Sequence, residues 1–139
     1  MKTLKLSPIV WGAWRLTRSS LTVQDLNRLI HECAELGITS FDHADIYGGY
    51  AAEGIFGQAL KLSPGLRDQV QLLTKCGIAA VSTLRPEHGT KTYNSSAAHI
   101  AACIDLSLES LGTGQLDLLM LHRPDYLMNA RETAQALKK

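Results

Sequence analysis

The stretch TSFDHADIYGGY, residues 39–50, begins like a buried strand and then brings several polar side chains in quick succession. Asp42, His43 and Asp45 follow the strand-like residues, and Tyr47 precedes two glycines. In folds built on parallel strands, ligands bind where the strands end, so polar groups at this point are typical of a functional site. Whether the chain has such a fold depends on the segments on either side.

Four strand-like segments alternate with longer segments of helical periodicity. The predicted strands are residues 8–14, 38–44, 70–78 and 116–122. The predicted helices extend from Thr22 to Gly37, through 55–60 as far as Pro64, from Ser95 or Ser96 to Gly112, and over residues 129–139. Thr22 is a predicted N-cap, and Asn129 with Glu132 has the spacing of a capping box.

Two further local expectations follow from the same pattern. The third helix is expected to face the core with four apolar residues, Ile100, Ile104, Leu108 and Leu111. Residues 80–94, which contain Gly and Pro, are predicted to form a loop between the third strand and this helix.

The alternation of strands and helices predicts an α/β fold with right-handed crossovers and a parallel sheet covered by helices. Two architectures satisfy the pattern: a small doubly wound sheet, and the N-terminal half of a (β/α)8 TIM barrel, whose full length is about 250 residues. The chain has 139 residues and no internal linker, so we expect one domain over residues 1–139.

Composition narrows the class of protein. Hydrophobic residues make up 45% of the chain, and 14 Lys and Arg face 13 Asp and Glu, which gives a formal net charge of +1. Such a balance, without a basic stripe, does not favour nucleic acid as a partner. Three widely spaced cysteines favour neither a disulfide framework nor a metal site. The sequence has no signal-peptide pattern and no apolar run of about 20 residues, so we expect a cytoplasmic protein that is not in a membrane.

Polar side chains end three successive predicted strands. Asp42 ends the second strand and Tyr47 follows it, Lys75 ends the third, and His122 ends the fourth. Because parallel strands point the same way, these side chains are expected to converge on one mouth of the sheet. A lone tyrosine, with a pKa of about 10, is a reluctant acid, but an ammonium within about 4 to 6 Å favours the phenolate. Such a group can donate a proton to a carbonyl that is being reduced.

Each of these residues taken singly has an ordinary structural explanation. Strand-end aspartates often shape turns, lysines often lie in solvent, and single histidines are more often structural than catalytic. For Asp45 we favour a hydrogen bond to its own loop over a contact with substrate. A functional site is favoured because these polar residues occur together at the ends of three successive predicted strands.

The stretches FDHADIYGG, LLTKCG and LDLLMLHRPD resemble the aldo-keto reductase superfamily, and the likeness covers nearly the whole chain. The resemblance implies that Tyr47 is the general acid, that Lys75 makes it a stronger acid, that Asp42 pairs with Lys75, and that His122 orients the substrate carbonyl. It implies reduction of aldehydes or ketones with NADP(H), and no metal.

The stretch WGAWRL resembles the end of the first strand in the same superfamily. By this likeness Gly12, Ala13 and Trp14 lie near the nicotinamide and the substrate pocket, and Asp42 also lies beside the cofactor. For Trp14, packing in the core is an equally good explanation. His43 and the long GGYAAEG link depart from many family members and suit a bacterial-type branch.

The length of the chain corresponds to only half of such a barrel. The resemblance places most of the cofactor site in the other half. We therefore expect a partial reductase that needs the second half. Two alternatives stay open: a homodimer of half-barrels that associates through open sheet edges, and a non-catalytic binding or regulatory module.

Overall fold

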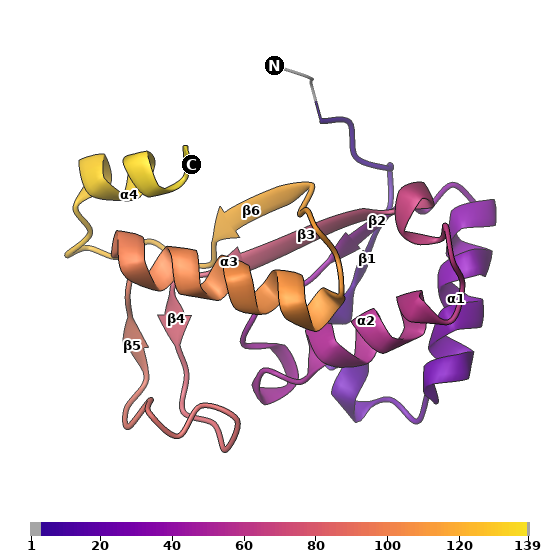
Figure 1. Cartoon of the computed structure of the whole chain (residues 1–139), viewed down its shortest axis with the longest axis horizontal. Coiled ribbons are helices and arrows are strands. Elements are labelled where there is room, and N and C mark those ends of the chain that lie inside the picture. The colour runs from indigo at the N-terminus through magenta and orange to yellow at the C-terminus, as the bar shows by residue number, and fades with distance from the viewer. Residues whose placement is uncertain (1–3, 139) are drawn as a thin grey trace.

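The computed structural model describes residues 4–138. The elements follow in the order β1 (Val10–Gly12), the 3₁₀-helix η1 (Ala13–Arg18), α1 (Val23–Glu35), β2 (Ser40–Asp42), η2 (Tyr47–Gly49), α2 (Ala52–Lys61), η3 (Arg67–Gln69), β3 (Gln71–Cys76), β4 (Ile78–Ala79), β5 (Thr92–Tyr93), α3 (Ala97–Leu111), β6 (Leu118–Leu121) and α4 (Ala130–Ala136). Figure 1 shows α1, α2 and α3 along the sheet, with the β4–β5 hairpin projecting away from it.

The main sheet has four parallel strands in the order β1-β2-β3-β6. Each new strand is added on the same side of the previous one, which is how a barrel grows; a doubly wound sheet reverses direction part of the way through. The arrangement confirms the prediction of an α/β fold with the topology of half a (β/α)8 barrel.

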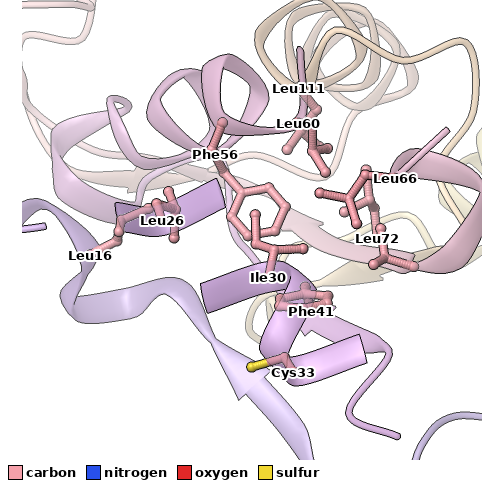
Figure 2. Close-up of a cluster of buried hydrophobic side chains, with 12 residues drawn as sticks. Leu16, Leu26, Ile30, Cys33, Phe41, Phe56, Leu60, Leu66, Leu72 and Leu111 are labelled. Carbon is pink, nitrogen blue, oxygen red and sulfur yellow. The ribbon is translucent and has the colours of Figure 1, made fainter. Parts of the chain in front are cut away.

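The main hydrophobic core lies between the sheet and the helices (Figure 2). Phe41 of β2 and Leu72 of β3 point into it, because neighbouring side chains on a strand alternate between the two faces of the sheet. Phe56 of α2 packs on Phe41 with ring centroids 5.3 Å apart, and Ile30 of α1 is fully buried beside them. The opposite face of the sheet therefore carries the alternate residues, among them Asp42 and Lys75.

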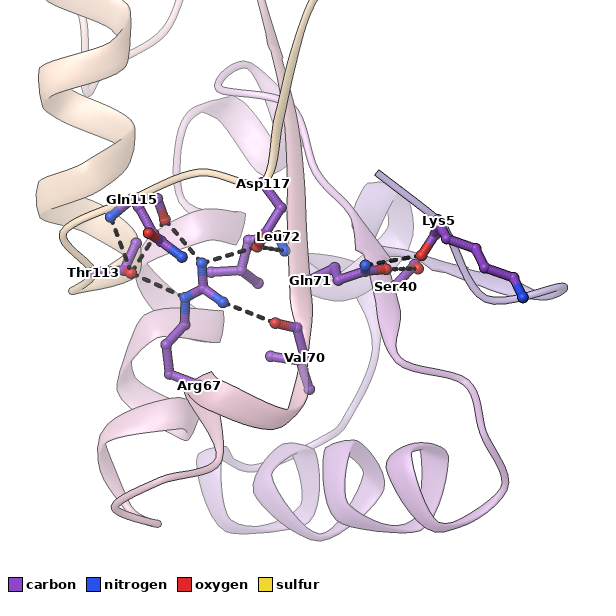
Figure 3. Close-up of polar contacts among 9 residues, drawn as sticks. All are labelled: Lys5, Ser40, Arg67, Val70, Gln71, Leu72, Thr113, Gln115 and Asp117. Carbon is purple, nitrogen blue, oxygen red and sulfur yellow. Dashed lines mark hydrogen bonds and ion pairs between the residues drawn. The ribbon is translucent and has the colours of Figure 1, made fainter. Parts of the chain in front are cut away.

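A polar network joins the amino ends of the strands (Figure 3). The Arg67 guanidinium donates to the carboxylate of Asp117 at 2.9 Å and to the carbonyl of Val70 at 2.8 Å. The same Asp117 oxygen accepts the backbone N–H of Leu72 at 2.8 Å. These contacts tie η3 to β3 and to the residues that precede β6, at the end of the sheet away from the polar strand ends.

The helix limits follow the predicted signals, with two differences at α4. Thr22 and Asp25 form a reciprocal capping box at α1, and Gly112 ends α3 with a φ of 65°. At α4 the Asn129 side chain accepts the Glu132 N–H, as predicted. The Glu132 carboxylate, however, accepts the backbone N–H of Ala97 at 3.1 Å, so it links α4 to α3. The predicted last helix ends earlier, at Ala136, and Lys139 lies outside the described residues.

Three sequence predictions about the other elements were wrong in detail. The first strand ends at Gly12, and Ala13 and Trp14 belong to η1. The third strand ends at Cys76 because Gly77 has a φ of 99°, and the predicted loop contributes β5, which pairs antiparallel with β4. On α3 the buried residues are Ile100, Cys103, Ser107 and Leu111, whereas Ile104 and Leu108 are only half-buried.

Candidate active site

The carboxyl ends of three neighbouring strands bring the predicted polar residues together. Asp42 is the last residue of β2 and lies level with Leu73 of β3. Lys75 lies two residues further along β3, so its side chain leaves the same face of the sheet as Leu73. His122 follows β6 directly, and its backbone N–H donates to the Cys76 carbonyl at 2.9 Å. The strand ends thus place Asp42, Lys75 and His122 at one mouth of the sheet.

Lys75 is the centre of the group. Its ammonium donates to Asp42 Oδ1 at 2.6 Å and to the backbone carbonyl of His43 at 2.8 Å. The third donor reaches the Tyr47 hydroxyl, with Nζ and Oη 3.4 Å apart. An ammonium has three N–H donors, so these contacts use all of them. Its side chain is only 17% exposed, which keeps the charge close to the phenol.

Tyr47 is positioned by a tight turn after β2. Its N–H donates to the Ala44 carbonyl at 3.0 Å, and it opens η2. Gly48 then has a φ of 60°, and a Cβ on it would lie 2.1 Å from the Thr17 side chain of η1. The glycine therefore lets η2 pack closely on η1 and aims Tyr47 toward the strand ends. The ring of Tyr47 meets that of His122 edge-on, with centroids 5.7 Å apart.

His122 is a neutral imidazole at neutral pH. Partial burial lowers its pKa below the ordinary value, and the positive charges of Lys75 and Arg123 lower it further. Its Nδ1 is buried and has no hydrogen-bond partner among residues 4–138. A neutral ring beside a phenol can donate one hydrogen bond to a carbonyl oxygen without adding a second full charge to the site.

A groove lies in front of this group. Its lining comes from five separate stretches of the chain, with the residues Trp14, Ile46, Tyr47, Gly48, Ile78, Lys91, His122 and Arg123. Trp14 is 61% exposed, so it is a wall of the groove and the core-packing alternative is wrong. Ala13 is buried, and Gly12 ends β1 beside Asp42. Contact of Gly12, Ala13 and Trp14 with a cofactor stays a prediction.

Lys91 and Arg123 are residues of the groove that sequence reasoning missed. Both are exposed, and both raise the positive potential at His122. Arg123 could have been suspected because it directly follows His122. Lys91 lies in the segment before β5, which is distant from the strand ends in the sequence and carries no motif.

Asp45 is not among the residues that line the groove. Its Oδ1 accepts the Ile46 N–H at 2.7 Å, which fits the loop role favoured from the sequence. Its N–H donates to the Lys75 carbonyl at 3.1 Å, so the residue fixes the loop to β3. His43 also points away from the groove: its ring is fully buried and meets Phe56 edge-on, with centroids 4.5 Å apart.

The groove places an apolar ring beside the polar group at the strand ends. The exposed indole of Trp14 offers a flat apolar surface, and the phenol of Tyr47 lines the same groove. Within the described part of the chain, no three His, Cys, Asp or Glu side chains are grouped as metal ligands. None of the helices in residues 4–138 has the length and apolarity needed to cross a membrane.

Fold and site together define a class of protein: half of a parallel β/α barrel whose strand ends bring an Asp, a Tyr, a Lys and a His side chain together. The sequence model of the aldo/keto reductase family matches residues 8–139. The chain belongs to the aldo/keto reductase family.

Individual relatives agree with this assignment. The chain is 47% identical over 135 residues to the uncharacterized oxidoreductase YcsN of Bacillus subtilis (strain 168), a match that covers 97% of the chain and 45% of the relative. It is 45% identical to a 6-dehydroglucose reductase of Agrobacterium fabrum, covering 96% of the chain and 46% of that protein. The chain thus spans about half the length of the curated relatives it matches.

A solved structure shows the same fold. The holo form of an aldo-keto reductase from Bacillus halodurans superimposes with a TM-score of 0.78 at 29% identity. The match covers 97% of this chain and 42% of that structure.

Proposed function

We propose that this chain supplies the proton-transfer half of an NADPH-dependent reductase of aldehydes or ketones, with Tyr47 as the proton donor. The observation that carries the proposal is the single ammonium of Lys75, which bonds Asp42 at 2.6 Å and Tyr47 at 3.4 Å in one geometry. The activity belongs to a complete barrel, of which the chain spans about half the length in its relatives.

Each residue has a distinct task in this chemistry. A bound nicotinamide supplies a hydride to the carbonyl carbon. Tyr47 gives its phenolic proton to the carbonyl oxygen, and the product is the alcohol. The Lys75 ammonium stabilises the phenolate left on Tyr47, since it donates to the same oxygen. Asp42 holds Lys75 in place, and neutral His122 donates a hydrogen bond to the carbonyl oxygen before the proton arrives.

The cofactor is proposed to approach through the end of the groove nearest β1. Trp14, Gly12 and Asp42 would lie beside the nicotinamide. A solved relative in a holo form supports a bound cofactor in this family. The preference for NADP(H) over NAD(H) rests on the family alone. Three free thiols at Cys33, Cys76 and Cys103 support the cytoplasm as the compartment.

We propose a polyhydroxylated aldehyde as the substrate class. Two relatives, 45% and 38% identical, are named 6-dehydroglucose reductases. The groove in this chain offers Lys91 and Arg123 as hydrogen-bond donors for hydroxyl groups, and Trp14 as a flat surface for a sugar ring. These groups lie in the same groove as Tyr47, so they would hold the polar part of a substrate while its aldehyde meets the phenol.

The test is Tyr47→Phe in a barrel completed with the C-terminal half of the Bacillus subtilis relative. Loss of the proton donor should lower kcat for an aldehyde about 10²- to 10⁴-fold, measured by NADPH oxidation. Tyr126→Phe is the matched control, because Tyr126 is 98% exposed and should leave the rate unchanged. Equal rates for Tyr47→Phe and the unmodified barrel would refute the role of Tyr47.

A further inference from the structure

The groove in front of Tyr47 carries two cations that the proposed proton transfer does not use. Lys91 precedes β5 and Arg123 directly follows His122, and both side chains line the groove. Both are exposed, and neither forms an ion pair with another of residues 4–138. The groove therefore holds two positive charges without a counter-ion from the described chain.

The main chain brings these two cations to the groove. Ile78 of β4 lines the groove and pairs with Tyr93 of β5. Lys91 lies two residues before Tyr93, so the alternation of side chains places it on the same face of the hairpin as Ile78. Arg123 comes from the end of β6, where the backbone N–H of His122 still bonds to β3 at 2.9 Å. Two elements that are far apart in the sequence thus present their cations to one groove.

The other charged groups near the groove do not balance these cations. The Lys75 ammonium and the Asp42 carboxylate pair with each other at 2.6 Å, so their charges cancel. Burial lowers the pKa of His122, which is neutral at neutral pH, and the positive charges of Arg123 and Lys91 contribute to the lowering. Among residues 4–138, no Asp or Glu lines the groove. The groove is therefore positive, although the formal net charge of the chain is only +1.

We propose that Lys91 and Arg123 select aldehyde substrates that carry an anionic oxygen group, either a carboxylate or a phosphate. The inference rests on the proposed reductase function and narrows its substrate class to a polyhydroxylated aldehyde that also bears an acidic group. The Arg123 guanidinium offers a planar pair of N–H donors that matches two oxygens of such a group, and Lys91 adds a compact charge. The groove has a volume of about 300 Å³, which gives room for a small molecule that contacts these cations and Tyr47 together.

The first test is steady-state kinetics of the barrel completed with the C-terminal half of the Bacillus subtilis relative. The anionic probes are 4-carboxybenzaldehyde and 4-formylphenyl phosphate, and 4-formylbenzamide is the neutral probe. The kcat/KM for one or both anionic probes should exceed that for the neutral probe about tenfold, and salt should reduce this ratio because it screens exposed charges. The anionic probe with the larger ratio identifies the preferred group. Equal kcat/KM values for all three probes would overturn the inference.

Arg123→Gln and Lys91→Gln remove one charge each and keep an N–H donor. Each variant should lower the ratio of anionic to neutral kcat/KM at least about threefold. Arg131→Gln is the matched control, because Arg131 is an exposed residue of α4 that does not line the groove, and it should keep the ratio. If the two groove variants instead raise the KM for NADPH and keep the ratio, the cations hold a phosphate of the cofactor and the inference is wrong.

This ratio is separate from the test of Tyr47. If the completed barrel prefers the anionic probes but Tyr47→Phe leaves its rate unchanged, the role of Tyr47 is refuted and the charge selection stands. If Tyr47→Phe abolishes the reduction but the three probes react equally, the role of Tyr47 stands and the charge selection is refuted.

A binding measurement on the 139-residue chain does not depend on activity. A bound carboxylate offsets the charges of Lys91 and Arg123, so benzoate should raise the pKa of His122, followed by NMR titration of its ring protons. Benzamide should leave the pKa of His122 unchanged, and in Arg123→Gln the rise with benzoate should be smaller. If neither benzoate nor phenyl phosphate raises this pKa at about 50 mM, where an anion with a dissociation constant on the order of 10 mM would be mostly bound, the inference is overturned.

Discussion

Two histidines, the fully buried His43 and the half-buried His122, have opposite relations to the site. His122 lines the groove, while His43 points between β2 and α2, where both of its ring nitrogens are buried without a partner in the described chain. The backbone carbonyl of His43 nevertheless accepts the Lys75 ammonium at 2.8 Å. His43 therefore contributes to the site through its backbone carbonyl. Its buried imidazole, which has no hydrogen-bond partner, destabilises the fold.

His43→Leu should make the chain less sensitive to acid. Burial, with a contribution from Lys75, lowers the pKa of His43 from 6.5 to about 3. Below pH 6.5 the unfolded chain takes up a proton that the folded chain refuses, so the unfolding free energy falls as pH falls toward 3. Leucine does not titrate, so this loss is absent from the variant. The unfolding free energy of the variant relative to the parent should therefore increase by roughly 2 kcal/mol when the pH is lowered from 8 to 5.

Urea unfolding of both proteins at pH 8 and pH 5 measures this difference. The value at pH 8 is the internal reference, because the imidazole is neutral there in both the folded and unfolded chains. Asp45 opposes the trend in both proteins: its raised pKa lets the folded state bind a proton first as pH falls from about 6 to 3.8. If the unfolding free energies of the parent and of His43→Leu differ by the same amount at pH 8 and at pH 5, then His43 is protonated in the folded chain and the prediction is wrong.

At the scale of elements, the network around Arg67 holds the amino ends of the sheet together. The guanidinium donates to Asp117, to the Val70 carbonyl and to the Thr113 hydroxyl, and it is 22% exposed. Arg67→Leu should lower the unfolding free energy by about 2 to 3 kcal/mol, because it leaves several acceptors without a donor. Denaturant unfolding of the chain gives the value.

Arg28→Leu is the control for this loss. Arg28 pairs with Asp25 on α1, but its side chain is 72% exposed and solvent screens the pair. Its removal should cost less than about 1 kcal/mol. Equal losses for Arg67→Leu and Arg28→Leu would show that the network adds no more than a surface ion pair does.

Much of the order of helices and strands could be predicted, because short sequence patterns mark where each of them begins and ends. Thr22 and Gly112 mark helix ends by their own conformational preferences, and the strands of the main sheet stand out as short apolar runs. The β4–β5 hairpin could not be predicted, because each strand has two residues and their pairing depends on the turn at Gly77. Glu132 was assigned to its own helix because its contact with Ala97 is tertiary.

The residues of the candidate site divide in the same way. Some can be found from the local sequence, and others only from contacts in the folded chain. Asp42, Lys75 and His122 could be found because each lies within one residue of the carboxyl end of a strand, and the fold brings these strand ends together. Arg123 and Lys91 lie on exposed segments whose approach to the groove depends on loop conformation.

At the scale of the whole molecule, the sheet has two outer strands. Within residues 4–138, β1 pairs only with β2, and β6 pairs only with β3. Their outward N–H and C=O groups form edges that can bind another strand. In a complete barrel other strands would cover them. We therefore expect the 139-residue chain on its own to self-associate, as a homodimer of half-barrels or a larger species, with a mass that rises with concentration.

A charge at an outer strand should weaken this association. Val10 lies in β1 and is 39% exposed, so Val10→Lys places an ammonium at the edge and opposes strand pairing. Val81→Lys makes the same change at a residue that is 63% exposed and lies outside the main sheet. Size-exclusion chromatography with light scattering should show more monomer for Val10→Lys than for Val81→Lys at equal concentration. A parent chain that stays monomeric, or equal effects of the two lysines, would contradict association through the edge of β1.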